Sequence, residues 1–365
     1  MQMEESRLHN SKKLALNPMA ALIEGLPDAV ALQILARVPL SCHPSMRAVN
    51  HAWRSHLYSE EFFKLREKIG SSEEWLYVSA REPDRLWQAF DPYSERWFSL
   101  PPLPSPVKYL SNFGTAALGG KIYVIGGGSD DVDLITGDRG GVAATNEVWV
   151  YDPIHREWQE KAPMLMARAQ FACCVLDGCI VVAGGFTHTR QFIATAEIYD
   201  PHENTWKSIA NLCQTMNSPC SGAVLEGKVY VIHKEVPLTQ VYDASHNKWM
   251  VVDCFLSQGP MGTVNGELYV IFNGIVSREH TSPALKRTIC SWPSWYRRVG
   301  FGVAGLKGEL YVVGGVTLPR QGDHDLEPLQ EVWICRVDGE WPCWRPGVSM
   351  TLSKGTVVGC VVLRL

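Results

Sequence analysis

The residues of this 365-residue chain that could do chemistry are few and widely separated. The strongest local pattern is Gly222-x-x-x-x-Gly227-Lys228, which begins like a phosphate-binding loop. In such loops backbone N–H groups and a lysine surround a phosphate, and a Ser or Thr after the lysine holds magnesium. This chain has Val229 at that position, inside an apolar run. The pattern therefore predicts a strand and excludes a nucleotide site.

Metal-ligating residues show no better arrangement. The eleven histidines are scattered, and the most compact acidic and imidazole group is Asp323-His324-Asp325. Adjacent residues in a polar loop usually face solvent in different directions, so a solvated loop is the favoured interpretation. No Ser-His-Asp arrangement can be recognised either. The sequence predicts no catalytic residue, no metal site and no cofactor.

Composition narrows the class of partner. The chain is 46% hydrophobic and 20% charged, with a formal net charge of −4, so it can bury a substantial core. Nucleic-acid binding needs a clustered positive surface, so nucleic acid is not expected as the main partner. No apolar run is long enough to cross a membrane. The eleven cysteines are odd in number and include no Cys-x-x-Cys, which favours reduced thiols in the cytoplasm or nucleus.

One module recurs along most of the chain. An apolar, β-rich run ends in Gly-Gly at 126–127, 184–185 and 314–315. A second run ends in an aromatic-Asp pair, and a tryptophan follows seven residues after the aromatic residue. These pairs are Phe90 and Trp97, Tyr151 and Trp158, Tyr199 and Trp206, and Tyr242 and Trp249. Short strands with a period of about 40 to 60 residues are typical of a propeller or solenoid, and the pattern resembles the kelch repeat.

The kelch resemblance predicts a closed propeller over residues 75–365. Second strands near 76, 122, 180, 229, 268 and 310 give six blades, each of four strands. The run 355–365 looks like a first strand with no blade after it, and 76–78 like a second strand with no first. We expect the C-terminal strand to complete the N-terminal blade, which removes an open edge. The last two strands of blade five are expected between 284 and 296. The repeat Tyr and Trp residues are expected to pack between neighbouring blades.

Two arginines occupy matching places in this pattern. Arg168 and Arg298 each stand ten residues before the glycine that opens a second strand, Gly178 and Gly308. Both therefore fall in connections between blades, on one rim of the propeller. A guanidinium there can bind acidic or aromatic groups. The sequence predicts that both arginines contact a bound target, with turn capping as the alternative.

The segment before the repeats differs in kind. Residues 1–19 are expected to be disordered, and 20–69 to form helices after Leu26-Pro27, over 44–57 and over 60–68. Val30, Ile34 and Val38 recur every four residues and give the first helix an apolar stripe. About 45 helical residues bury little core by themselves, so this segment is expected to dock on another protein.

The same segment resembles the F-box. The matching residues, in order, are Leu26-Pro27, Leu32, Ile34-Leu35, Val38-Pro39, Arg47-Ala48-Val49 and Trp53-Arg54. The chain departs from the family at 50–52, where it has Asn-His-Ala and the family usually has Cys-Lys before the Trp-Arg pair. A small all-α F-box followed by an all-β six-bladed kelch propeller resembles the plant F-box/kelch-repeat proteins.

That resemblance implies a function. Such a protein is the substrate receptor of an SCF (Skp–cullin–F-box) ubiquitin ligase, in which the F-box binds a Skp-family adaptor, and through it cullin, while the propeller binds a target protein. The resemblance implies an adaptor-binding face made of Leu26, Pro27, Leu32, Ile34, Leu35 and Val38. Two alternatives remain: an interaction scaffold without ubiquitin chemistry, and a metal-dependent enzyme on a kelch fold.

Overall fold

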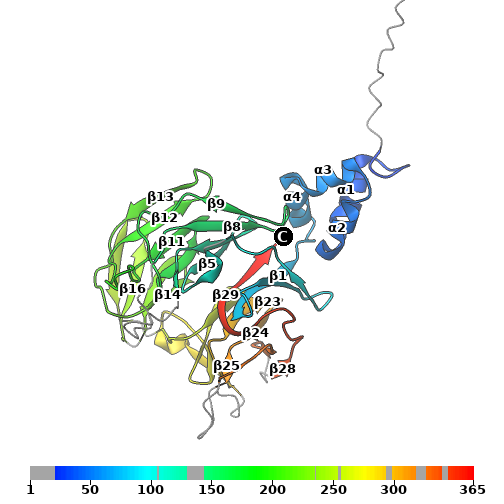
Figure 1. The fold of residues 1–365 in the computed structure, drawn as a ribbon. Coiled ribbons are helices and arrows are strands. Elements are labelled where there is room, and N and C mark those ends of the chain that lie inside the picture. The colour runs from blue at the N-terminus through cyan, green and yellow to red at the C-terminus, as the bar shows by residue number, and fades with distance from the viewer. Residues whose placement is uncertain are drawn as a thin grey trace, which may run out of the picture. The chain divides into compact units, whose positions relative to one another are not determined.

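The computed structural model describes residues 21–104, 107–129, 144–234, 236–253, 256–292, 298–317, 326–338 and 344–365. The expected disordered N-terminus, 1–19, and the Asp-His-Asp loop at 323–325 lie outside the described residues. The chain divides into two compact units, Met1–Glu73 and Glu74–Leu365 (Figure 1). The first is helical and the second is built from strands, and each is described by itself.

The helical unit contains four α-helices and a short 3₁₀ helix in its described part. They are α1 (Asp28–Ala36), η1 (Leu40–Cys42), α2 (His43–Met46), α3 (His51–Leu57) and α4 (Glu60–Lys68). The predicted single helix over 44–57 is wrong. The Asn50 side chain accepts a hydrogen bond from the Trp53 backbone N–H at 2.8 Å, so Asn50 caps a new helix where the sequence had suggested continuity. Ser59 caps α4 in the same way.

A small core joins these helices. Its buried members are Leu35, Ala36, Met46, Leu57 and Phe62, and partly buried apolar side chains that include Leu32, Val38 and Trp53 pack against them. The Trp53 indole N–H donates to the Leu22 carbonyl at 2.7 Å, which holds the chain before α1 against α3. The core is thin, as expected for a unit of this size.

The second unit contains six four-stranded antiparallel sheets among its described residues, in agreement with the predicted blades. Blade one is β29 (Lys354–Arg364), β1 (Glu74–Glu82), β2 (Trp87–Asp91) and β3 (Arg96–Ser99). Blade two is β5 (Gly114–Leu118), β6 (Lys121–Ile125), β8 (Val148–Asp152) and β9 (Glu157–Lys161). Blade three is β10 (Ala172–Leu176), β11 (Cys179–Ala183), β12 (Ala196–Asp200) and β13 (Thr205–Ile209).

The remaining blades follow the same order. Blade four is β14 (Cys220–Leu225), β15 (Lys228–His233), β16 (Thr239–Asp243) and β17 (Lys248–Val252). Blade five is β18 (Met261–Val264), β19 (Glu267–Phe272), β20 (Ile275–Arg278) and β21 (Arg287–Ser291). Blade six is β23 (Gly302–Leu306), β24 (Glu309–Val313), β27 (Val332–Arg336) and β28 (Trp344–Pro346). Short ladders join β4 (Leu110–Ser111) to β7 (Gly128–Ser129), and β22 (Arg298–Val299) to β25 (Val316–Thr317) and β26 (Glu327–Pro328).

The C-terminal strand completes the N-terminal blade, as predicted. β29 pairs antiparallel with β1, with Leu76 opposite Val362 and Val78 opposite Cys360, and Figure 1 shows the two strands side by side. β29 also contacts β5 of blade two and β23 of blade six. Pairing the two ends of the unit in one sheet gives β1 a hydrogen-bonded neighbour on each side, β29 and β2, so β1 is not an open edge.

Blade five corrects one prediction. Its third strand, β20, begins at Ile275, before the expected range of 284–296, while β21 falls inside that range. The turn between β19 and β20 is Asn273-Gly274, with φ of 49° and 75°. Asn-Gly with both φ angles positive is the strongest short hairpin signal, so the sequence did contain the information.

Antiparallel topology gives every blade two edges with different loops. One edge, here called the turn edge, carries the tight turns between first and second strands, such as Asp177-Gly178. The opposite edge, here called the connection edge, carries the connections from second to third strands and from one blade to the next. Gly127 N donates to the Arg168 carbonyl at 2.9 Å, which shows that these two kinds of connection lie together.

The repeat tryptophans tie neighbouring blades together. The indole N–H of Trp206 in blade three donates to the Ala162 carbonyl that follows blade two, at 2.8 Å. The same bond recurs from Trp158 to Pro101, Trp249 to Ala210, Trp97 to Val348 and Trp344 to Ser291. The prediction that these residues pack between blades is confirmed.

Removing one indole N–H should weaken the propeller modestly. Trp206→Phe keeps a large ring against Tyr199, 5.0 Å away between centroids, and deletes the donor to Ala162. We expect the free energy of unfolding to fall by about 1 kcal/mol, measured by urea denaturation. Tyr109→Phe, at a side chain that is 54% exposed, is the control and should leave stability unchanged.

Candidate functional site

Helix α1 is apolar on two faces. Ala31 and Leu35 are buried and at most 2% exposed, whereas Val30 and Ile34, one turn apart and about 100° around the helix from them, are each 44% exposed. Val49, after α2, is 58% exposed. A surface helix normally carries polar residues on its outer side, so an apolar outer face indicates that a partner covers it.

The structure distributes the predicted adaptor-binding residues unevenly. Pro27 and Ile34 are exposed, and Leu26, Leu32 and Val38 are partly buried. Leu35 is 2% exposed and belongs to the core, so its assignment to a docking face is corrected. The exposed large apolar residues of α1 are Val30 and Ile34. Leu35 belongs to the F-box pattern because its side chain packs α1 against the core of the helical unit.

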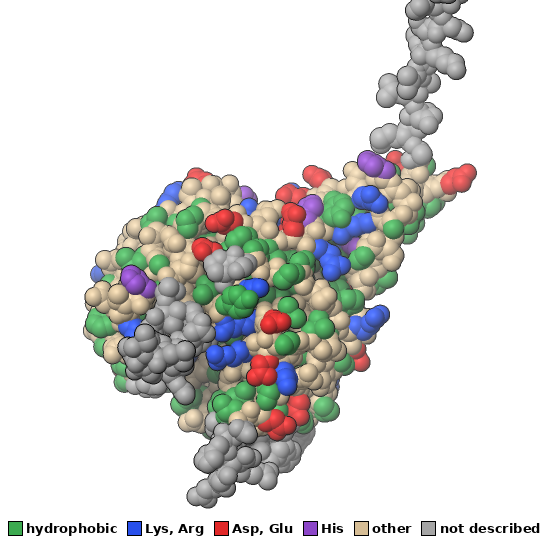
Figure 2. Space-filling model, viewed as in Figure 1, with side chains coloured by type: hydrophobic (Ala, Val, Ile, Leu, Met, Phe, Trp, Pro, Cys, Tyr) green, Lys and Arg blue, Asp and Glu red, His purple; other side chains and the backbone are tan. Residues whose placement is uncertain are grey.

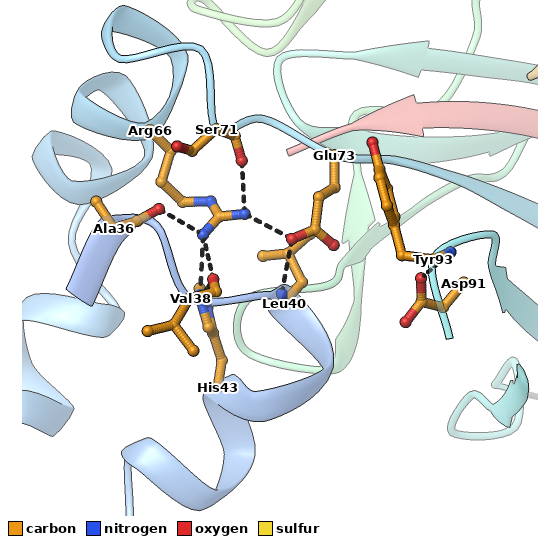
Figure 3. A network of polar contacts seen from close by, with 9 residues as sticks. All are labelled: Ala36, Val38, Leu40, His43, Arg66, Ser71, Glu73, Asp91 and Tyr93. Atoms are coloured by element: carbon orange, nitrogen blue, oxygen red, sulfur yellow. Dashed lines mark hydrogen bonds and ion pairs between the residues drawn. The ribbon is translucent and has the colours of Figure 1, made fainter. Parts of the chain in front are cut away.

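The end of the helical unit is fastened by a buried arginine. Arg66 of α4 is fully buried and donates to the carbonyls of Ala36 and Val38, at 2.8 and 2.7 Å, where α1 ends (Figure 3). It also donates to the Glu73 carboxylate at 3.0 Å. Glu73 in turn accepts from the Leu40 backbone N–H at 3.0 Å. The segment that leaves α4 is thus bound to the helices.

His43 lies beside this arginine. Its Nε2 is 3.4 Å from Arg66 Nη1, and the ring contacts Phe62 at 5.7 Å between centroids. Burial, reinforced by the charges of Arg66 and Arg47, lowers the pKa of His43 from 6.5 to about 3. The imidazole is therefore neutral in the folded unit at physiological pH, and protonation would place a second cation next to the guanidinium.

The helical unit should lose stability in mild acid. Because the unfolded chain binds a proton on this histidine near pH 6.5 and the folded unit only near pH 3, stability falls as pH drops through that window. At pH 5 the loss is about 2 kcal/mol. Circular dichroism melts at pH 7 and pH 5 would measure it. His43→Gln should flatten this dependence, and an unchanged slope in that variant would contradict the assignment.

Arg168 is not available to a ligand. It is 0% exposed and donates to the carbonyls of Gly184 and Thr195, both at 3.0 Å. Its Nη2 lies 2.5 Å from Oε1 of the buried Glu197. Arg298 occupies the equivalent place: it is 7% exposed and donates to the carbonyls of Gly314 and Glu331.

These contacts correct the expectation for both arginines. Their positions match, as the spacing predicted. Their guanidinium groups, however, donate hydrogen bonds to internal carbonyls and, at Arg168, to the Glu197 carboxylate. Direct contact with a target would require breaking those bonds. The alternative role, holding a turn, fits the geometry.

A set of carboxylate and amide side chains that hold the connections between blades was not predicted from the sequence. Glu197 accepts from the backbone N–H groups of Leu165 and Met166, at 2.7 and 3.1 Å, in the connection that precedes blade three. Side-chain oxygens accept from backbone N–H groups in the same way at three other places. The backbone N–H of Gln214 donates to Gln240, that of Ser257 to Glu279, and that of Leu352 to Gln88. A position that is Glu or Gln near the third strand of several repeats is the signal that could have revealed it.

Exposed apolar side chains gather at the connection edge of blade three. Leu165, Met166 and Phe192 are 60%, 38% and 50% exposed. The backbone N–H groups of Leu165 and Met166 donate to Glu197. Phe192 forms an isolated β-bridge with Phe186, and Phe186 forms another with Ala169. Rigid presentation of apolar groups lowers the entropic cost of binding, so this edge has the properties of a protein-binding surface.

The surface otherwise shows mixed chemistry. On the face in Figure 2, acidic and basic side chains both occur, with hydrophobic side chains scattered among them. Within the described residues, no group of three or more His, Cys, Asp or Glu side chains is placed to hold a metal ion. None of the described helices has both the length and the apolar character needed to cross a membrane.

Comparison with known families agrees with both units. The F-box domain model matches residues 23–65, and the Kelch motif model matches 110–165 and 167–212. A solved structure titled "Structure of YjhT" superposes with a TM-score of 0.56 at 14% identity, covering 74% of this chain and 94% of that one. At that identity the likeness concerns the fold alone.

A relative that matches over nearly its full length defines the family. An F-box joined to a kelch propeller is the organisation of an F-box substrate adaptor. The Arabidopsis thaliana F-box/kelch-repeat protein SKIP30 is 43% identical over 347 residues, which cover 95% of this chain and 98% of the relative. F-box/kelch-repeat protein At1g67480 is 36% identical over 214 residues, covering 58% and 54%. The chain belongs to the F-box/kelch-repeat protein family.

Proposed function

We propose that this protein is the substrate-recognition subunit of an SCF ubiquitin ligase. The observation that carries the proposal is the uncovered apolar face of α1, Val30 and Ile34, on an F-box that precedes a kelch propeller. The face binds a Skp-family adaptor by helix docking, and the adaptor links the chain to cullin. The propeller binds a target protein through its connection edge.

In this role the protein makes and breaks no covalent bond. Holding the target and the adaptor on one chain raises the effective concentration of target lysines near a charged ubiquitin-conjugating enzyme. The arrangement supplies proximity, and the ligase supplies the chemistry. We propose the cytoplasm, the nucleus or both as its location, on the basis of its cysteine content, and a fluorescent fusion would test this.

Reconstitution tests the proposal. The purified full chain should co-elute with a purified Skp-family adaptor on gel filtration, and the pair should bind a cullin–RING module. Proximity labelling in cells, with and without proteasome inhibition, should reveal proteins that accumulate only under inhibition. Ubiquitin transfer to such a protein in the reconstituted system would support the proposal. An intact chain that never binds an adaptor would instead identify a scaffold.

A further inference from the structure

A pocket opens at the connection edge between blades four and five. Its volume is about 430 Å³. Ser221 of β14, Lys234 at the end of β15, Pro260 and Met261 of the next blade, and Phe272 at the end of β19 line it. A volume of this size falls within the range of ligand sites in proteins.

The pocket lies where the connections are short. In blades two, three and six the second strand runs into Gly-Gly and then a long connection, for example from Ile125 to Val148. In blade four the same position reads His233-Lys234, and β16 begins already at Thr239. In blade five, only Asn273-Gly274 separates β19 from β20. Short connections leave this sector of the edge uncovered.

Two glycines, Gly222 and Gly259, form part of the pocket wall. A Cβ atom on Gly222 would lie 2.5 Å from the Cys174 Sγ, and one on Gly259 would lie 2.2 Å from the Ile271 carbonyl oxygen. Neither position can carry a side chain without displacing its neighbours, so glycine keeps the backbone close-fitting there. The wall has a fixed shape.

The lining combines one cation with apolar groups. Lys234 is exposed, its backbone N–H donates to Pro219 O at 2.9 Å, and its carbonyl accepts from the Ser218 hydroxyl. None of the described lining residues is acidic, and no carboxylate in the described part of the chain forms an ion pair with Lys234. Phe272, 46% exposed, and Met261 supply apolar surface beside the ammonium group.

We propose that this site, the Lys234 pocket, binds a target segment in which a carboxylate side chain lies next to a large apolar side chain. The carboxylate pairs with the Lys234 ammonium, and the apolar side chain covers Phe272 and Met261. The inference rests on the proposed function, since it names the chemistry of the target that the propeller binds. Charge complementarity selects the acidic residue, and apolar burial supplies affinity.

Peptide display on the full chain tests the pocket. The probe is a phage library of random twelve-residue peptides. We expect enriched sequences to share Asp or Glu next to an aromatic or long aliphatic residue. Replacing the acidic residue of a synthetic peptide by its amide should weaken binding roughly tenfold, and Lys234→Glu should do the same. A peptide with Lys in place of the acid should regain binding to Lys234→Glu.

A matched variant lies on the same strand. Lys228, also exposed, begins β15 at the turn edge, so Lys228→Glu makes an equal charge change away from the pocket and should alter binding less than twofold. Enrichment of sequences without an acidic residue, or unchanged binding by Lys234→Glu, would overturn the pocket assignment. Adaptor co-elution, measured on the same samples, reports on the proposed function separately.

Discussion

Replacing Ile34 by aspartate is expected to abolish capture of the chain by a Skp-family adaptor while leaving the F-box folded. The side chain is 44% exposed on the outer face of α1, so the folded unit tolerates a carboxylate there. In the complex the same carboxylate would be buried against an apolar surface without a partner, which is costly. We expect affinity to fall by more than about 100-fold, measured by calorimetry with purified adaptor.

The propeller offers a closely matched control. Ile275 is also 44% exposed, and Ile275→Asp makes the identical substitution in the other unit. Adaptor affinity should not change in that variant. If Ile34→Asp binds as tightly as the wild type while its circular dichroism is unaltered, the outer face of α1 is not the docking surface.

Leu35 shows why burial must be known before such variants are chosen. The side chain is 2% exposed, and Leu35→Ala should cost about 2–5 kcal/mol of F-box stability. Loss of adaptor binding in that variant would report unfolding and would say nothing about contact. The sequence motif alone could not separate Leu35 from Ile34, because adjacent apolar residues in a short helix leave both faces possible.

Repetition explains how much of the fold was predictable. Six copies of the second strand and a constant spacing from an aromatic residue to Trp predicted the blades and the pairing of the C-terminal strand with β1, because each blade repeats the same local rules. Two predictions failed because a local turn or cap signal was overlooked, one in the repeats and one in the helical unit. The Asn273-Gly274 turn starts the third strand of blade five earlier than predicted. The Asn50 cap starts a new helix inside the range that was predicted to be one helix.

The binding residues were harder to predict for a different reason. The role of Arg168 depends on Glu197, which lies 29 positions away in sequence and 2.5 Å away in space. The Lys234 pocket depends on the absence of Gly-Gly in blades four and five, a departure from the repeat and not a motif. The burial of a side chain, and the contact of residues that are distant in sequence, are properties of the folded chain. A single sequence indicates them only indirectly.

Arg168→Met is expected to lower the free energy of unfolding of the propeller by about 3–5 kcal/mol. The substitution removes the cation and leaves the Glu197 carboxylate, whose side chain is 2% exposed, without its counter-charge. It also removes donors from the carbonyls of Gly184 and Thr195. Urea denaturation monitored by tryptophan fluorescence would measure the loss.

A second Arg–Glu pair of the same length provides the comparison. Arg345 and Glu309 are also 2.5 Å apart, but their side chains are 49% and 19% exposed, so Arg345→Met should cost no more than about 1 kcal/mol. Adding Glu197→Gln to Arg168→Met should recover part of the lost stability, because it removes the stranded charge. Equal effects from the two single arginine variants would mean that burial does not decide the role of Arg168.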